Sequence, residues 1–209
     1  MDKKKYKAYY PLPCRFNLMY DPMKKLLFVI FIVIALLLAS IMNGYCQDKS
    51  TAEEYQVKAA FLYNFARFIE WPKQTLTSTD TFNLCILGND PFGDSLNLIK
   101  GKMIGNKRLE VKFCKDINDI GQCHILFISS SEKSHLTALL SVLNNAHVLT
   151  VSDIEGFALH GGIINFFTEE NKIRFEINVG AASRNGLIIS SKLLQLAKIV
   201  GTNYRNDKN

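Results

Sequence analysis

The sequence predicts an α/β fold in three layers, with helices on both faces of a mainly parallel sheet of about six strands. The first observation is that short apolar runs, typical of buried strands, alternate with segments of helical spacing across residues 52–151. The second is that two β-branched and aromatic runs, 163–167 and 173–178, flank a polar turn. The sheet is therefore predicted to close with a C-terminal antiparallel hairpin.

The first predicted helix starts at Thr51, a suitable N-cap, and ends at Trp71, because the residue before Pro72 avoids the α region. Mostly apolar side chains recur in it at helical spacing, which predicts a stripe that faces the core: Val57, Ala60, Phe61, Asn64, Phe65 and Phe68. In the alternative interpretation, some aromatic side chains of this segment stay exposed and bind a partner protein, the candidates being Tyr63, Phe65 and Trp71.

Four strands then alternate with two helices, and the strands are predicted at 82–87, 108–113 (a half-exposed edge strand), 124–128 and 147–151. The helices are predicted at 94–99 and after Ser129, where Ser129 and Glu132 would form a capping box. The link 153–162 is too short for a helical crossover, so we expect the fifth strand to run antiparallel, with the hairpin at one edge of the sheet.

The end of the chain combines a polar strand face with an apolar helix. Arg174, Glu176 and Asn178 share one face of the last strand by the period of two. We interpret this face as solvated or ion-paired, and the alternative is a polar patch within a partner or dimer interface. A closing helix that seals one face of the sheet is predicted from the spacing of Ile189, Leu193, Leu196 and Val200.

A charged and then apolar segment precedes the domain. Lys24 and Lys25 are followed by the uncharged run 26–42, and this is the pattern of a secretory signal peptide at 23–46. Residues 1–22 carry three prolines and no periodicity, which indicates an over-extended gene start. We expect one domain at 52–200 and a polar tail at 201–209.

Two alternatives compete with a cleaved signal peptide. The first is an uncleaved membrane anchor, although the apolar run is short for a membrane span. The second is lipidation at Cys46, which Asn43 and Tyr45 disfavour because a lipoprotein signal has aliphatic and small residues there. Each possibility places the domain outside the cytoplasm, in the periplasm.

Composition limits the classes of partner. A hydrophobic content of 48% predicts a packed core rather than a disordered chain. Residues 1–46 hold seven of the 25 Lys and Arg residues and two of the 19 Asp and Glu residues, which leaves 18 basic and 17 acidic residues in 47–209. The domain is therefore nearly neutral, at +1. Because nucleic-acid binding needs a basic face, this balance argues against a nucleic-acid partner.

The domain shows no catalytic motif. Its four histidines lack the closely spaced ligand pairs of a zinc site, so we expect no metal at His124, His135, His147 or His160. The run 129–131 lacks the Gly-x-Ser-x-Gly pattern of a hydrolase and is interpreted as a helix start.

The loop 88–93 follows a buried strand, and open α/β sheets often bind ligands at this position. It lacks the glycine pattern of a nucleotide-binding loop, so a plain turn is expected and a small-ligand pocket is the alternative. The candidate ligand residues come from this loop and from the loop after the third strand: Gly88, Asp90, Phe92, Ser129 and Ser131.

Several stretches, by their order and spacing, resemble one protein family. They are YQVKAAFLYNF at 55–65 with Trp71-Pro72, LCILGNDPFG at 84–93, CHILFI at 123–128, GGII at 161–164, and IRFEIN at 173–178 with SSKLL at 190–194. Over about 52–200, the chain resembles the YfiR-like periplasmic proteins. The resemblance implies a small secreted α/β domain without catalytic activity.

The best-known members of this family are periplasmic repressors. They bind the periplasmic sensor domain of an inner-membrane diguanylate cyclase and hold it inactive, which lowers cyclic di-GMP and biofilm growth. Their function is tied to disulfide state and to dimerisation. They also carry a second cysteine pair in the region that matches 156–167, where this chain has none, so redox control through that pair is not carried over.

The domain itself holds three cysteines, Cys85, Cys114 and Cys123, and export permits a disulfide. Cys114 ends one predicted strand and Cys123 begins the next, which in a parallel sheet separates them far beyond the roughly 7 Å limit between Cα atoms. Cys85 and Cys123 lie on strands that we expect to be neighbours, and the resemblance also implies this pair. The alternative is that all three are buried thiols.

The leader and the resemblance together predict a non-enzymatic periplasmic regulator without a cofactor. Its expected partner is an inner-membrane signalling protein, a diguanylate cyclase or another sensor, and the resemblance adds a homodimer as a candidate assembly. The alternative is a periplasmic small-ligand binding module that serves another sensor or transport system. We expect the final hairpin to supply an interface rather than a redox switch.

Overall fold

The computed structural model describes residues 22–77 and 80–201, and within the first helix it describes the side chains of 26–36 and 51–68. The chain divides into two compact units, Met1–Gln47 and Asp48–Asn209. The over-extended start and the polar tail that the sequence predicts fall almost wholly outside the described residues. Within the described part, no helix combines the length and the hydropathy that crossing a membrane requires.

The first helix, α1, runs from Pro22 to Phe68. Proline suits the first turn of a helix, and no other proline occurs before Pro72, so the sequence contains no strong breaker in between. Thr51 therefore lies inside α1, and the prediction that it caps the first helix of the domain is wrong. The short strand β1 (Ile69–Glu70) leads the chain to Trp71 and Pro72.

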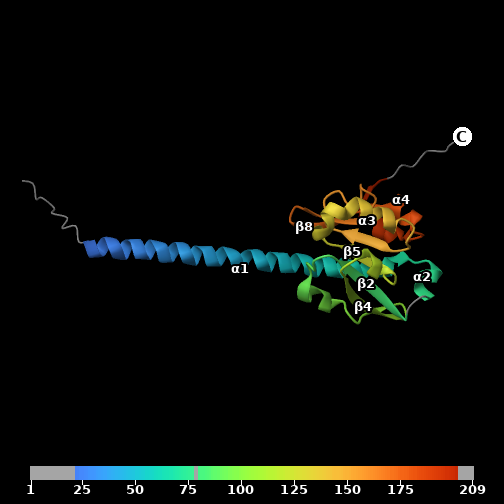
Figure 1. Ribbon diagram of the computed structural model, residues 1–209, viewed down its shortest axis with the longest axis horizontal. Helices are drawn as coiled ribbons and strands as arrows, with labels where there is room; N and C mark the ends of the chain where they lie inside the picture. Colours follow the sequence, from blue (N-terminus) through green and yellow to red (C-terminus); the bar gives the residue numbers. More distant parts are fainter. Residues whose placement is uncertain (1–21, 78–79, 202–209) are drawn as a thin grey trace, which may run out of the picture. The chain divides into compact units, whose positions relative to one another are not determined.

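Eight strands form the main sheet, in the order β10-β8-β7-β6-β5-β2-β4-β3. They are β2 (Thr81–Leu87), β3 (Met103–Ile104), β4 (Lys107–Cys114), β5 (Ile125–Ile128), β6 (Leu149–Ser152), β7 (Ile164–Glu169), β8 (Lys172–Asn178) and β10 (Lys198–Val200). Figure 1 labels β8, β5, β2 and β4 of this sheet. The five consecutive strands from β4 to β7 in this order are parallel, which confirms the predicted fold class. The strand predicted at the edge, β4, is covered by β3 in antiparallel pairing.

The direction of β7 corrects the sequence prediction. β7 runs parallel to β6, with Val151 opposite Ile164, and not antiparallel. Between the end of β6 and the start of β7 the chain forms successive turns and no helix. Phe157 N–H donates to the Ile154 carbonyl, and Gly162 N–H donates to the Phe157 carbonyl. A side chain at Gly162 would overlap the Phe157 ring, so glycine lets the return path pass this close.

The predicted hairpin of β7 and β8 is present, but it does not end the sheet. β10 pairs in parallel with the far side of β8 and forms the edge. The predicted closing helix is also wrong, because 188–200 forms three short elements: β9 (Ile188–Ile189), α5 (Ser191–Leu194) and β10. β9 pairs with β1 to form a separate two-stranded sheet.

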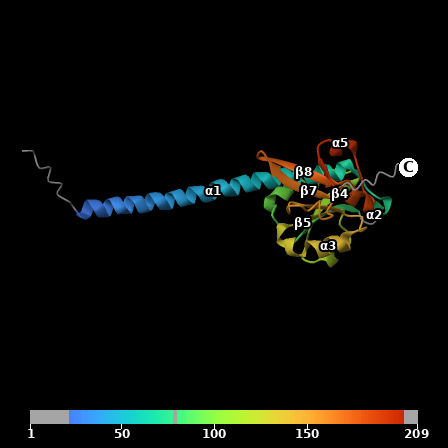
Figure 2. The same cartoon turned by 90° about the horizontal axis from the view of Figure 1, so that it is seen from above.

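Helices cover both faces of the main sheet. The remaining α-helices are α2 (Lys73–Thr77), α3 (Leu136–Leu143) and α4 (Val179–Arg184), and three 3-10 helices are η1 (Gly93–Leu98), η2 (Ile117–Ile120) and η3 (Ser130–His135). Figure 2 shows α3 and α5 on opposite sides of the strands. The side chains of α1, α4 and α5 contribute to one core cluster and those of α3 to another.

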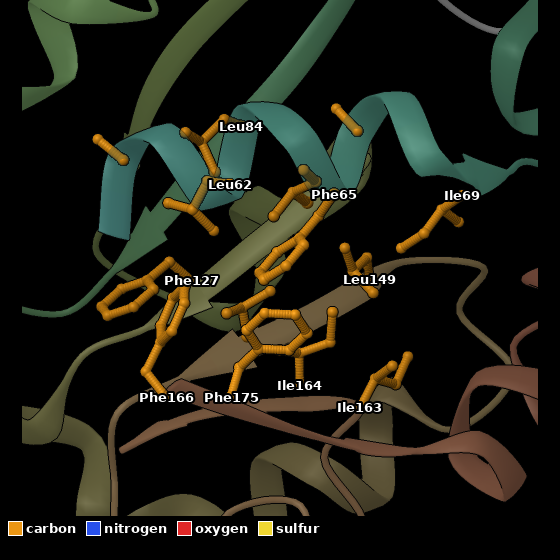
Figure 3. Close-up of a cluster of buried hydrophobic side chains, with 14 of the residues drawn as sticks. Leu62, Phe65, Ile69, Leu84, Phe127, Leu149, Ile163, Ile164, Phe166 and Phe175 are labelled. Carbon is orange, nitrogen blue, oxygen red and sulfur yellow. The ribbon is translucent and has the colours of Figure 1, made fainter. Parts of the chain in front are cut away.

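Aromatic side chains fill the core under α1 (Figure 3). Phe65 is fully buried and lies between two strands, with its ring centroid 5.7 Å from Phe166 and 5.1 Å from Phe175. Leu62 and Ile69 extend this contact along the helix. The sheet and the C-terminal part of α1 thus form one packed body.

Candidate interaction surface

The part of α1 that belongs to the domain carries two apolar stripes, and only one of them faces the sheet. The buried stripe consists of Ala59, Leu62, Phe65, Ala66 and Ile69, the last just beyond the helix. In the second stripe, Val57 and Phe68 are 44% and 38% exposed, and Phe61 and Asn64 are half-buried. The predicted core stripe mixed the two, because both repeat at three and four residues. It is wrong for Val57, Ala60 and Phe68.

A groove runs beside the second stripe, in two hollows that share Phe61. The first, of about 610 Å³, lies between α1 and the β7–β8 hairpin and includes Glu53, Val57, Phe61, Thr168, Lys172 and Ile173 in its lining. The second, of about 90 Å³, is lined by α1, β8 and α5, with Phe61, Asn64, Phe68, Phe175, Leu193 and Leu196. We call the two together the α1 groove. Leu196 is 69% exposed at its end.

The polar face of the last strand, interpreted from the sequence as solvated or ion-paired with a partner or dimer surface as the alternative, is divided in the structure. Arg174 is exposed, and its Nε lies 3.9 Å from the Glu169 carboxylate. Glu176 and Asn178 are buried instead, because β10 covers β8. Asn178 accepts a hydrogen bond from Ala181 N–H and so caps α4, and its amide donates to the Ala158 carbonyl. The Glu176 carboxylate also lies 3.8 Å from the Lys198 ammonium, so this side of β8 is ion-paired and only partly solvated.

Of the three aromatic candidates, Phe65 is buried in the core, and Tyr63 and Trp71 are half-buried and lie away from the α1 groove lining. The Tyr63 hydroxyl donates to the Met103 carbonyl, and the Lys102 ammonium lies 5.3 Å from its ring. Trp71 packs on Phe82, and its indole N–H donates to the Ala66 carbonyl. Trp71 also lines a separate open hollow of about 630 Å³.

The structure brings the two candidate ligand loops together. The Asn89 N–H donates to the Ser131 hydroxyl oxygen at 3.0 Å, and a side chain at Gly88 would overlap that hydroxyl. Asp90 accepts from the Phe92 N–H, and Phe92 is buried against Tyr55 and Phe127. These contacts link the loops that follow β2 and β5.

Ser129 is also buried, with its N–H donating to the Leu87 carbonyl. The predicted capping box is not formed. The Ser129 side chain makes no capping hydrogen bond. The Glu132 carboxylate instead accepts a hydrogen bond from the Ser131 hydroxyl.

A buried charged cluster that the sequence analysis missed joins α1 to the end of β6. Lys58 is 3% exposed, and its ammonium lies 2.7 Å from Asp153 and 2.6 Å from Glu54. The Tyr55 hydroxyl donates to the same Asp153 carboxylate at 2.9 Å. Burial, aided by this carboxylate, raises the pKa of Tyr55, which keeps the phenol a neutral donor. The only sequence signal is an i,i+4 spacing of Glu54 and Lys58.

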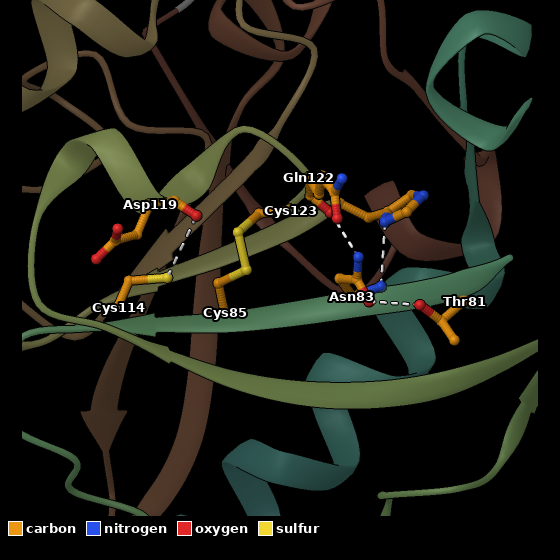
Figure 4. The surroundings of a disulfide bond; sticks show 8 residues. Thr81, Asn83, Cys85, Cys114, Asp119, Gln122 and Cys123 are labelled. Carbon is orange, nitrogen blue, oxygen red and sulfur yellow. Dashed lines mark hydrogen bonds between the residues drawn. A yellow bond between two sulfur atoms is a disulfide. The ribbon is translucent and has the colours of Figure 1, made fainter. Parts of the chain in front are cut away.

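A disulfide joins Cys85 of β2 to Cys123, just before β5, with 5.8 Å between their Cα atoms (Figure 4). This is the pair that the resemblance implied. Cys114 is a buried free thiol, and burial raises its pKa. Although the ladder places Cys114 and Cys123 on opposite sides of β2, the three sulfur atoms all lie within 4.8 Å of one another. The sequence did not show this convergence of side chains.

His124 follows the disulfide and lies on the opposite face of the sheet. It is 1% exposed, and its ring stacks on Phe82 with 4.5 Å between centroids. Its Nδ1 accepts a hydrogen bond from the Asn83 N–H at 3.1 Å, so the ring must be neutral at that nitrogen. Burial is the main cause that lowers the pKa of His124 from 6.5 to about 4.

Domain stability is expected to fall between pH 6.5 and pH 4 because of His124. In this range the unfolded chain binds a proton that the folded chain excludes, so the free energy of unfolding decreases as pH falls, by at most about 1.4 kcal/mol per pH unit. His124→Asn, which keeps an acceptor for Asn83, should remove this part of the slope in urea titrations. Equal slopes for the wild type and His124→Asn would contradict the assignment.

Comparisons with known proteins place these features in context. The model of a family described as YfiR/HmsC-like matches residues 55–198. No curated protein shows a significant match. A solved conserved domain protein from Vibrio cholerae O1 biovar El Tor is similar at 12% identity and a TM-score of 0.43, over 61% of this chain and 56% of that chain.

A second similar structure is an ABC domain in complex with L-Trp from Streptococcus pneumoniae. It has 10% identity and a TM-score of 0.41, over 59% of this chain and 56% of its own. The chain thus spans little more than half the length of either structure. Similarity at this level carries no argument about function.

Proposed function

The chain belongs to the YfiR/HmsC-like family, and from this premise we propose that it is a non-enzymatic periplasmic repressor of an inner-membrane diguanylate cyclase. Family membership supports a periplasmic regulatory protein in cyclic di-GMP signalling in general. In the specific proposal, the domain binds the periplasmic sensor domain of the cyclase. Repression needs no chemistry by this chain, because binding that favours the inactive conformation of the cyclase is sufficient.

The α1 groove is the single observation that carries the choice of binding surface. A folded domain normally buries side chains such as Phe68 and Leu196, and exposed apolar residues grouped in a concave surface are a feature of protein interaction sites. Aromatic side chains near the centre of an interface supply much of its binding energy. Phe61 and Phe68 fit this role, with Glu53, Lys172 and Lys192 as a polar rim.

The leader supports the proposed location. The basic residues Lys24 and Lys25 and the apolar run that follows have the pattern of an export signal. Export would place the domain on the side of the membrane where the sensor domain of the cyclase lies. A membrane-anchored form would also reach that partner.

Partner binding is expected to fail when the groove becomes charged. In Phe68→Asp, a carboxylate would be desolvated at the interface, so capture of the cyclase from detergent-solubilised membranes should drop at least about tenfold, which corresponds to about 1.4 kcal/mol. Phe113→Asp is the matched control, because Phe113 is 62% exposed on β4 and lies outside the groove. Mass spectrometry identifies the captured protein, and cyclic di-GMP levels report repression in cells.

Three results would contradict the proposal. The wild type could capture no diguanylate cyclase, Phe68→Asp could capture it as well as the wild type does, or both variants could lose it equally. Size-exclusion chromatography of the wild type and Phe68→Asp tests whether the groove is instead a homodimer contact. If Phe68→Asp changes only the oligomeric state and leaves cyclase capture intact, the groove binds a second copy of the chain instead.

A further inference from the structure

Three sulfur atoms converge in the core on the α3 side of the sheet, where the disulfide needs only two. Cys85, Cys114 and Cys123 are all at most 5% exposed, and their sulfur atoms lie within 4.8 Å of one another. Figure 4 shows Cys114 directed toward the disulfide from the neighbouring strand. The Cys114 thiol donates a long hydrogen bond, of 3.9 Å, to the Asp119 carbonyl.

A disulfide between Cys85 and Cys114 does not account for this convergence. Cys114 is opposite Leu87 and Cys85 is opposite Lys112, so the two cysteines share a face but are offset by two residues along the ladder. Strands about 4.8 Å apart with about 3.3 Å per residue put their Cα atoms roughly 8 Å apart. A disulfide needs about 4.4–6.8 Å, so the backbone would have to move.

A metal ion fits the same separation without that movement. Thiolate–zinc bonds of about 2.3 Å place the sulfur atoms of a tetrahedral site about 3.8 Å apart, which is below the 4.8 Å that limits the separations of the three sulfur atoms here. The sulfur atoms of Cys85 and Cys123 are bonded in the disulfide, so they reach this separation only after reduction. Thiolates select soft or borderline cations such as Zn²⁺. We propose that the reduced protein binds one thiophilic divalent cation through Cys85, Cys114 and Cys123. This inference does not depend on the proposed repressor function.

The chemistry of the site balances in two steps. A dithiol reductant gives two electrons and two protons to the Cys85–Cys123 disulfide and becomes a disulfide itself, which leaves three thiols in the protein. Each thiol then releases its proton as it binds the cation. Three thiolates and a divalent cation carry a net charge of −1, with a water molecule in the fourth position.

The apolar surroundings favour a neutral thiol over a free thiolate. Burial raises the pKa of Cys114, and the positive charge of Lys112 opposes this effect. A divalent cation cancels two of the three thiolate charges, so it overcomes most of the cost of burying them. The disulfide and the cation use the same two sulfur atoms, and each therefore excludes the other.

The test uses the full chain with Cys14→Ser and Cys46→Ser, so that only the three domain cysteines are present. After anaerobic reduction and removal of the reductant, Co²⁺ is titrated as a spectroscopic probe and then displaced by Zn²⁺. We expect one Co²⁺ per chain with thiolate-to-cobalt charge-transfer absorption, and no such absorption in the oxidised protein. In the same background, Cys114→Ser should weaken binding at least about tenfold, the lower end of losses at metal sites.

A second readout covers the case in which the reduced chain is unstable. Zn²⁺ should raise the melting temperature of the reduced three-cysteine protein by mass action, or refold it, and at the same Zn²⁺ concentration should have a smaller effect on reduced Cys114→Ser. The oxidised Cys114→Ser protein should keep the disulfide and melt close to the oxidised parent, which shows that the variant folds. The proposal is overturned if Cys114→Ser binds Co²⁺ as tightly as its parent, or if the parent shows no thiolate–cobalt band.

Discussion

Replacement of Phe65 by alanine is expected to destabilise the domain by about 3–5 kcal/mol, because it removes a buried ring and leaves a cavity. Phe65 is fully buried under α1 and contacts the rings of Phe166 and Phe175 from two strands. The neighbouring rings are attached to paired strands, so they fill the space only in part. Urea unfolding followed by circular dichroism measures the loss.

Phe68→Ala is the matched control, three residues along the same helix. Phe68 is 38% exposed, so its replacement should cost less than about 1 kcal/mol. The pair of variants tests which stripe of α1 faces the core. A larger loss for Phe68→Ala than for Phe65→Ala would show that the two stripes are assigned the wrong way round.

Asp153→Ala is expected to cost about 3 kcal/mol of folding stability. The change removes a carboxylate that binds both the Lys58 ammonium and the Tyr55 hydroxyl, and it leaves the buried ammonium with Glu54 as its acidic neighbour. Removing one partner of a buried ion pair typically costs about 3–5 kcal/mol, and the exposed edge of this cluster places the loss at the lower end. Thermal and urea unfolding measure it.

Glu155→Ala removes an exposed carboxylate two residues away and should stay within about 0.5 kcal/mol of the wild type. Replacing Lys58 and Asp153 together with Met and Leu should cost less than Asp153→Ala alone, because no buried charge is left without its partner. A double variant that is less stable than Asp153→Ala would contradict a buried ion pair as the source of the effect.

Continuous apolar runs predicted the central strands well. The segment predicted at 82–87 forms β2, and the segment predicted at 124–128 forms β5 except for its first residue. The prediction works because a strand buried on both faces must be apolar along its length. The C-terminal end was predicted less well. The spacing of Ile189, Leu193 and Val200 fits a helix. Ile189 instead lies in β9, which pairs with β1, and Val200 lies in β10, which pairs with β8. Short apolar segments follow their tertiary neighbours more than their own periodicity.

The candidate site depended even more on the tertiary structure. The sequence showed that α1 is rich in apolar residues, but not that Val57 and Phe68 lie on the side away from the sheet. It also showed three cysteines and the i,i+4 pair of Glu54 and Lys58, without the partners that these residues meet. Asp153 lies 95 residues from Lys58, and such a contact exists only once β6 is beside α1.

By itself, the sequence determined the fold class, the family and the central strands, because these depend on residue type and on the order of apolar segments along the chain. The tertiary structure alone decided which stripe of α1 is left uncovered, which way β7 runs, and that three sulfur atoms meet. Each of these depends on which surfaces pack together, since burial and distance are properties of the assembled sheet and not of local spacing. The α1 groove is therefore defined by what the sheet leaves exposed.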